Sequence, residues 1–207
     1  WIVEKKENGY VIMSALNSDY VIDLSGGIIS EGRNIQLYQS NDTNAQRWNF
    51  IHISKEDKLA RQNKNTLEDG TYTISSTLNN NFVLDIKNDS KADTGNVQLN
   101  LDNSSNSNEF IVTHDSTGYV TFTNVNSGKV LDVSSGIVEN GRNIQQYVSN
   151  GTKAQKWIVA KKGNGYVIMS ALNSDYVIDL SGGIISEGRN IQLYKSNDTK
   201  AQRWNFN

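Results

Sequence analysis

VIDLSGGIISEGRNIQLYKSNDTKAQRW, residues 177–204, is the stretch that decides the fold, because its pattern recurs along the chain. It holds a short apolar segment ending in Asp179, an Asn-Ile-Gln segment beginning at Asn190 and a closing Gln-x-Trp ending at Trp204. A repeat of fixed period indicates an architecture of equivalent structural units. Four copies are present, and each closing aromatic residue follows its Asp by 25 positions: Asp23 and Trp48, Asp85 and Phe110, Asp132 and Trp157, Asp179 and Trp204.

The spacing between copies, numbered one to four in chain order, divides the chain into domains. The closing aromatic residues of copies two, three and four lie 47 positions apart, whereas copies one and two are separated by 62. The additional residues fall within 51–69, a polar and charged segment whose composition is typical of a linker. We therefore expect residues 70–207 to form one complete unit of three repeats, and residues 1–50 to be the last repeat of a truncated upstream unit.

Copies one and four are nearly the same sequence, which supports this division. Residues 1–50 and 157–206 are identical at 46 of 50 positions, whereas copies two and three differ widely from both. A recent duplication of a whole unit explains such a pair, so we expect a covalently linked upstream domain in the parent protein. The four differences are Glu4/Ala160, Glu7/Gly163, Gln39/Lys195 and Asn44/Lys200.

Each repeat predicts four short β-strands and no helix. Apolar and polar residues alternate, β-branched residues are frequent, and turn residues separate the strands every 8–12 positions. Three four-stranded repeats can close into a small barrel capped by hairpins, which leaves few open sheet edges. The sequence therefore predicts an all-β fold of twelve strands over 70–207, in which Phe110, Trp157 and Trp204 point into the core.

Composition and charge exclude several classes of function. The net charge is −2 with scattered cations, which argues against nucleic-acid binding. No stretch is long and apolar enough to insert into a membrane, and the absence of Cys excludes disulfides and thiolate metal sites. His52 and His114 lie in the predicted linker and in copy two, so no pair of histidines suggests metal ligation or a catalytic relay. We expect no enzymatic activity and no cofactor.

The strand ending in Asp, the Asn-(Ile/Val)-Gln segment, the aromatic residue after it and the Gln-x-Trp resemble the ricin B-type lectin family, which includes family 13 carbohydrate-binding modules. The resemblance covers residues 70–207 completely and 1–50 as a single repeat. It implies a β-trefoil fold and multivalent carbohydrate binding, with a galactose-type or polysaccharide glycan as partner. It also implies a secreted, extracellular module, similar to those of Gram-positive bacteria, that targets an enzyme or toxin to a glycan.

The same resemblance implies one shallow pocket per repeat. A carboxylate accepts hydrogen bonds from neighbouring sugar hydroxyls, an aromatic ring stacks on the pyranose and an amide completes the contacts. The residues implied are the carboxylates Asp23, Asp132 and Asp179, the aromatic residues Tyr38, Tyr147 and Tyr194, and the amides Gln145, Gln155, Gln192 and Gln202.

Two departures from the family pattern leave alternatives open. The family often has Asn before the closing Gln, where this chain has Ala154 and Ala201, although Asn150 and Asn197 are near in sequence. In copy two an Asn replaces both the stacking aromatic residue and the closing Gln, so we expect the site at Asp85 to be inactive. The Asp residues can instead cap turns and the Tyr residues can belong to the core rim. The alternative function is protein interaction by a trefoil whose sugar sites have lapsed.

Overall fold

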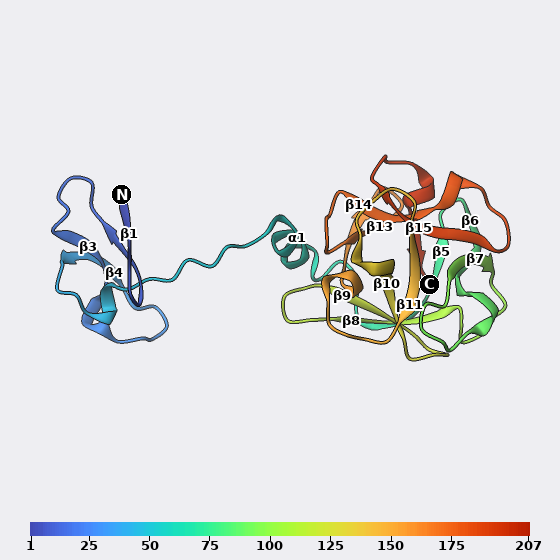
Figure 1. Ribbon diagram of the computed structural model, residues 1–207, viewed down its shortest axis with the longest axis horizontal. Coiled ribbons are helices and arrows are strands. Elements are labelled where there is room, and N and C mark those ends of the chain that lie inside the picture. The colour runs from blue at the N-terminus through green and yellow to red at the C-terminus, as the bar shows by residue number, and fades with distance from the viewer. The chain divides into compact units, whose positions relative to one another are not determined.

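The computed structural model describes residues 1–207, which form two compact units, Trp1–His52 and Ile53–Asn207 (Figure 1). The first unit contains copy one. It is a four-stranded antiparallel sheet in sequential order, in which each strand pairs with the next along the chain. Its strands are β1 (Ile2–Lys6), β2 (Gly9–Met13), β3 (Tyr20–Leu24) and β4 (Ile35–Gln39).

The second unit contains copies two, three and four, and its twelve strands belong to one sheet. Short 3-10 turns separate several of the strands. The all-β prediction is confirmed for residues 70–207. The strands are β5 (Gly70–Ser76), β6 (Asn79–Ile86), β7 (Val97–Leu101), β8 (Glu109–His114), β9 (Val120–Asn124), β10 (Val130–Val133), β11 (Arg142–Tyr147), β12 (Trp157–Lys162), β13 (Gly165–Ser170), β14 (Tyr176–Leu180), β15 (Arg189–Lys195) and β16 (Trp204–Phe206).

Pairing between repeats closes this sheet on itself. Strands β8 and β9 join copy two to copy three, β12 pairs with β9 and β13, and β16 returns to pair with β5 at the start of copy two. The third strands of copies two, three and four also meet, because β15 pairs with both β11 and β7. The three equivalent repeats thus form the pseudo-threefold arrangement of a β-trefoil.

The closing aromatic residues fill the core of the second unit, as predicted. Phe110, Trp157 and Trp204 are completely buried, and the apolar residues of the surrounding strands pack with them. Because side chains alternate across a strand, the residue before each Asp points inward; these residues, Leu84, Leu131 and Ile178, are completely buried. Burial of this apolar surface is the main favourable contribution to folding.

A ring of three asparagines lies where the three repeats meet. Asn96 Nδ2 donates to Asn190 Oδ1 at 3.0 Å, Asn190 Nδ2 to Asn143 Oδ1 at 3.0 Å, and Asn143 Nδ2 to Asn96 Oδ1 at 2.9 Å. Each amide therefore donates once and accepts once, and each repeat contributes one member. This ring explains the Asn of the Asn-(Ile/Val)-Gln segment, since an amide is both a donor and an acceptor.

One helix, α1 (Lys55–Asn63), lies inside the segment 51–69 that the sequence predicts to be a linker. Ser54 and Asp57 form a capping box, in which each side chain bonds the backbone N–H of the other. Ala60 of the helix is completely buried and packs with Tyr119, Ile158 and Ala171 of the trefoil. A nine-residue helix is marginal alone, so this packing supplies its stability. No helix of the chain is long and apolar enough to cross a membrane.

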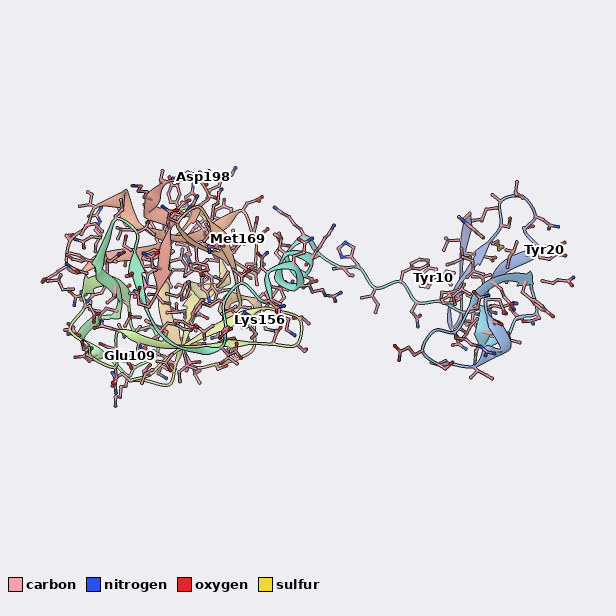
Figure 2. All side chains as sticks on the ribbon, turned by 180° about the vertical axis from the view of Figure 1, so that it is seen from behind. Tyr10, Tyr20, Glu109, Lys156, Met169 and Asp198 are labelled. Atoms are coloured by element: carbon pink, nitrogen blue, oxygen red, sulfur yellow. The ribbon has the colours of Figure 1, made fainter.

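The first unit exposes the face that copy four buries. Trp1 is 71% exposed and Leu37 51% exposed, whereas their counterparts Trp157 and Leu193 in copy four are completely buried. Tyr20, labelled in Figure 2 among the side chains of this unit, is also exposed. One repeat supplies only one third of a trefoil interior, and a unit of this size buries too little surface to cover its own apolar face.

Replacement of Asn143 by Ala should lower the free energy of unfolding of the second unit by about 1–3 kcal/mol, because two ring partners lose a hydrogen bond. Urea unfolding of the full chain, followed by tryptophan fluorescence, measures this change. Asn34 occupies the same position in copy one, where its side chain makes no hydrogen bond, so Asn34→Ala is the matched control and should leave stability unchanged. Equal effects of the two substitutions would show that the ring contributes nothing.

Candidate functional site

A buried carboxylate lies at the centre of each candidate site, on the second strand of the repeat. Asp132 on β10 faces Gln145 on β11 as a cross-strand pair. Its Oδ1 accepts a hydrogen bond from Gln145 Nε2 at 2.9 Å, and its Oδ2 accepts one from Gln155 Nε2 at 3.1 Å. Each oxygen therefore has one donor from the protein and keeps capacity for a second.

Copies four and one repeat this geometry. Gln192 and Gln202 donate to the two oxygens of Asp179 at 2.8 and 3.0 Å. In the first unit, Asp23 accepts from Gln36 at 2.9 Å and from Gln46 at 3.1 Å. The arrangement thus depends on the repeat itself, because it is the same inside the closed trefoil and in the four-stranded unit.

The Gln of the Gln-x-Trp motif lies beneath the carboxylate. Gln155 is 2% exposed, and its Nε2 also donates to the carbonyl of Val148, while its Oε1 accepts the backbone N–H of Asn150. Its hydrogen-bonding groups are therefore used within the repeat. The structure places Gln155 and its counterpart Gln202 as supports of the carboxylate, whereas the sequence implied that they line the pocket.

Three pockets open above these carboxylates. They have volumes of about 510 Å³ at Asp132, 420 Å³ at Asp179 and 510 Å³ at Asp23. The structure brings together the predicted carboxylate and aromatic residue in every case, with the predicted first amide in copies three and four and with Gln36, which was not predicted, in copy one. The pocket-lining members of these sets are Asp132, Gln145 and Tyr147, then Asp179, Gln192 and Tyr194, then Asp23, Gln36 and Tyr38.

The walls of the pockets include two leucines that the sequence did not identify and an asparagine, Asn150, that it did. Leu172 of copy four lines the Asp132 pocket, and Leu78 of copy two lines the Asp179 pocket, so the following repeat contributes one wall. Asn150 also lines its pocket, with Oδ1 accepting the backbone N–H of Thr152 and Nδ2 making no hydrogen bond within the protein. A Leu recurs at the same turn of copies one, two and four. The pocket that it lines belongs to another repeat, so the sequence of one repeat does not reveal this role.

A tight turn forms the remaining wall, and an arginine holds it. In copy three the turn Ser134–Gly136 follows the Asp strand, and Arg142 Nε donates to the carbonyl of Ser134 at 2.7 Å. Arg189 makes the same contact to Ser181 in copy four at 2.6 Å. These contacts give the recurring arginines a structural role.

Copy two contains the Asp but uses up its acceptor capacity. Asp85 Oδ1 accepts from Ser107 Oγ at 3.0 Å and from Asn108 Nδ2 at 2.9 Å. Its Oδ2 accepts from Gln98 Nε2 at 2.8 Å and from Asn100 Nδ2 at 3.4 Å. Four donors from the protein surround this carboxylate, compared with two at Asp132, and the stacking aromatic residue is absent. Asp85 is therefore a structural residue of the repeat.

Burial controls the protonation of the two carboxylates in the trefoil. It raises the pKa of Asp132 and of Asp179 above the ordinary value, while the hydrogen bonds from the Gln amides oppose the shift. Both groups are largely buried and form no ion pair, so the hydrogen bonds that compensate their charge come from amide donors. The ionised form nevertheless offers strong acceptors to a ligand that supplies hydroxyl groups.

The chain belongs to the ricin-type β-trefoil lectin domain-like family, whose sequence pattern matches residues 1–100, 61–147 and 106–194. No curated protein matches the chain. Among solved structures, the designed threefold-symmetric protein ThreeFoil is similar with a TM-score of 0.64 and 26% identity over 67% of this chain and 98% of its own.

Two natural proteins have the same fold at lower identity. The Macrolepiota procera ricin B-like lectin, solved in complex with lactose, has a TM-score of 0.59 and 18% identity over 68% of this chain and 96% of its own. A mosquitocidal holotoxin has a TM-score of 0.60 and 20% identity over 100% of this chain, which spans only 23% of the toxin. These two likenesses establish the fold alone.

The supporting role of Gln155 can be separated from the ligand-facing role of its neighbours. Gln155→Ala should lower the free energy of unfolding by about 2–3 kcal/mol, because it leaves buried polar partners unsatisfied. Tyr147→Ala, at a half-exposed position of the same pocket, should cost less than about 1.5 kcal/mol. Chemical denaturation of both variants checks the difference, and a Gln155→Ala protein as stable as the parent would refute the supporting role.

Proposed function

We propose that the protein is a multivalent carbohydrate-binding module, with one sugar at each of the Asp132, Asp179 and Asp23 pockets. The observation that carries this proposal is the partly satisfied carboxylate beside a half-exposed tyrosine. Two neighbouring hydroxyls of a pyranose can donate to the free positions of Oδ1 and Oδ2, and the C–H face of the sugar can pack on the tyrosine ring.

The free amide of Asn150 adds a donor to this set. Its Nδ2 has no partner within the protein, and in copy four Asn197 lines the Asp179 pocket in the same way. Both positions compensate for Ala154 and Ala201, where the family often has Asn, because each supplies an amide to its pocket from a different point of the loop. The ligand class is a galactose-type sugar or a polysaccharide, and lactose bound to the Macrolepiota procera lectin supports a carbohydrate partner.

Shallow sites of this kind give weak individual binding, near the ~1 mM range that corresponds to about −4 kcal/mol. Linked sites on one chain see one another at an effective concentration of order mM, which raises avidity by ~10²–10⁴. Multivalent attachment to a glycan surface therefore fits the geometry better than capture of a free monosaccharide. We propose that the module serves a secreted enzyme or toxin by holding it to such a surface.

Binding should fall with the number of intact carboxylates. A glycan array identifies the sugar, and calorimetry with that sugar should give about three sites per chain. Asp132→Ala and Asp179→Ala together should leave one site, because the ligand loses both charge-assisted acceptors at each altered pocket. Asp85→Ala, at the fully satisfied carboxylate, is the matched control and should leave the stoichiometry unchanged. Absence of any glycan ligand would instead favour a protein-interaction trefoil.

Acidification should abolish binding at the Asp132 and Asp179 pockets before it unfolds the protein. The pKa of Asp132 and of Asp179 is raised by burial, so their acceptors are lost as the pH falls through values above the ordinary carboxyl range. In the same window the folded state binds more protons than the unfolded state, so these two groups contribute more stability as the pH falls. Calorimetry and circular dichroism at matched pH values test this order; binding that persists until unfolding would contradict it.

We also propose that residues 1–50 are the last repeat of a second trefoil, completed by two further repeats. The exposed Trp1 and Leu37 and their buried counterparts in copy four support this proposal. The sequence of copy one must then function as the third repeat of a closed trefoil, which can be tested inside the second unit.

Ala160→Glu, Gly163→Glu, Lys195→Gln and Lys200→Asn together convert copy four into the sequence of copy one. All four positions are at least partly exposed, so the variant should keep a cooperative unfolding transition within about 1–2 kcal/mol of the parent. Thermal and urea unfolding measure it. Loss of cooperative unfolding would show that copy one is incompatible with trefoil closure, and the proposal would fail.

A further inference from the structure

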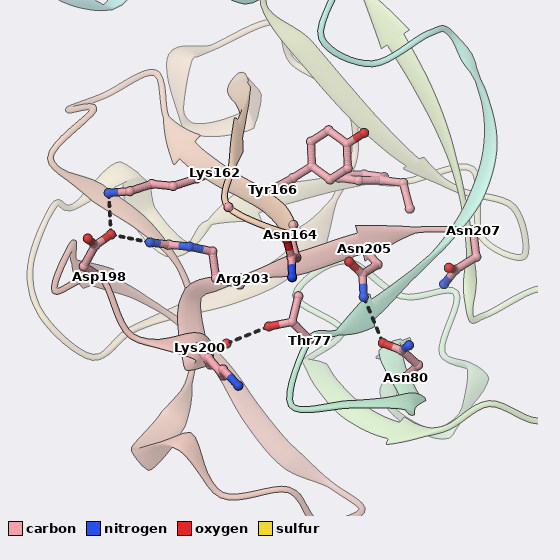
Figure 3. Close-up of a pocket in the computed structure, with 13 residues that line it drawn as sticks. Thr77, Asn80, Lys162, Asn164, Tyr166, Asp198, Lys200, Arg203, Asn205 and Asn207 are labelled. Atoms are coloured by element: carbon pink, nitrogen blue, oxygen red, sulfur yellow. Dashed lines mark hydrogen bonds and ion pairs between the residues drawn. The ribbon is translucent and has the colours of Figure 1, made fainter.

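A fourth pocket, of about 820 Å³, lies beside the Asp179 site (Figure 3). It is formed where copy four meets copy two, by the turn between β12 and β13, the last residues of copy four and the turn between β5 and β6. Tyr166 and Phe206 provide an aromatic wall, with ring centroids 5.2 Å apart in an edge-to-face arrangement. Asn80 and Asn205 provide amides and are joined by a hydrogen bond of 2.8 Å. Aromatic rings and amides together suit a sugar.

The charges of this pocket are mainly positive. Asp198 accepts from both Lys162 and Arg203, which Figure 3 shows on one side of the pocket. Lys200 is exposed, and its ammonium group makes no ion pair within the protein. Three cations and one carboxylate therefore line the pocket, and the cation without a partner belongs to Lys200.

Lys200 also joins this pocket to the Asp179 site. Lys200 lines both cavities, and Leu78 in the Asp179 pocket is the neighbour of Thr77 in the larger one. The two cavities therefore adjoin, with Lys200 as the lining residue that they share.

The equivalent groove of copy three is occupied by helix α1. Tyr119 and Lys153 are the counterparts of Tyr166 and Lys200, 47 positions earlier in the chain. Tyr119 donates to Asp57 of the helix at 2.7 Å, and Lys153 lies 3.9 Å from the same carboxylate. These contacts lower the pKa of Asp57 to about 2, with the hydrogen bond from Tyr119 as the largest cause. In copy three, therefore, a carboxylate already lies beside the lysine that corresponds to Lys200.

The sequence differences between copies one and four also favour positive charge in copy four. Every one of the four replaces an acidic residue by a neutral one or a neutral residue by lysine, so copy four is more positive by four charges. Two of them, Gly163 and Lys200, line this pocket. Two otherwise matching repeats thus diverge only in charge, and half of the changes fall where the pocket lies.

We propose that this pocket is a second subsite that binds a carboxylate-bearing residue of a glycan whose neighbouring neutral residue occupies the Asp179 pocket. The proposal rests on the proposed sugar binding at Asp179. Lys200 provides the charge that selects the acidic residue, and the aromatic wall and amides contact its ring. Copy three lacks this subsite because α1 fills the groove and Asp57 offsets Lys153.

The test compares two full-length chains that each retain one sugar pocket of the trefoil. Asp23→Ala with Asp132→Ala leaves the Asp179 pocket, and Asp23→Ala with Asp179→Ala leaves the Asp132 pocket. The probes are two matched pairs, lactose with sialyllactose and xylotriose with glucuronylated xylotriose. The readout is the ratio of affinities within a pair, measured by calorimetry at low and high salt.

The chain with the Asp179 pocket should bind the acidic member roughly three- to tenfold more tightly, with a preference that shrinks as salt rises. The chain with the Asp132 pocket should show a ratio near one. In the first chain, Lys200→Asn should reduce the ratio to about one, whereas Lys195→Gln, which removes the same charge outside the pocket, should preserve it.

Other outcomes overturn the proposal and can be told apart. An equal acidic preference in both chains, or equal losses from Lys200→Asn and Lys195→Gln, would indicate a general charge effect. Neutral sugar binding without acidic preference would refute the subsite and leave the proposed function standing, whereas no binding of any probe, together with a glycan array that finds no ligand, would refute both. Lys200-dependent binding of a peptide with the sequence of residues 54–64 in place of the acidic sugars would make the groove a helix-docking site.

Discussion

The hydrogen bonds from the Gln-x-Trp motif to the strand that contains the Asp are the interaction on which both the core and the candidate site depend. Trp157 Nε1 donates to the carbonyl of Leu131 at 3.3 Å, and Gln155, two residues earlier, donates to the carboxylate of Asp132. Trp204 makes the same bond to Ile178 in copy four. The motif therefore holds consecutive residues of one strand, one facing the core and the other facing the pocket. Packing of the indole fixes the carboxylate as well, and this coupling explains the constant spacing of 25 residues.

Copy two shows that the fold tolerates the loss of the site. Phe110 fills the core without an N–H to donate, and Asn108 replaces the Gln while still bonding Asp85. The strand is held, but Ser107 and Asn100 turn toward the same carboxylate and satisfy it from within. A repeat can thus retain its Asp for structural reasons after its pocket chemistry has gone. The presence of Asp alone does not identify a site, and the number of donors around it does.

The sequence was sufficient for features that one repeat contains. The spacing predicted the strands and the inward aromatic residues, because the alternation of side chains lies within a repeat, and the family resemblance implied the grouping of Asp132 with Tyr147. Features that join repeats could not be predicted. The asparagine ring, the leucine wall at Leu172 and the docking of α1 each require a partner from another copy or from the segment before it. The helix carried a local signal, the Ser54–Asp57 capping box, but its short polar sequence resembled a linker.

Departures from threefold symmetry are what distinguish the sites of this trefoil. The repeats have the same backbone fold, so each junction between copies contains an equivalent groove. The residues that surround the groove determine what it can bind. At copy three, α1 covers Tyr119 and brings a carboxylate to Lys153. At copy four no helix follows that path, and Lys200 faces an open cavity. A single helix beside three equivalent repeats is therefore enough to make the surroundings of two similar pockets chemically different, without any change in the strands that carry them.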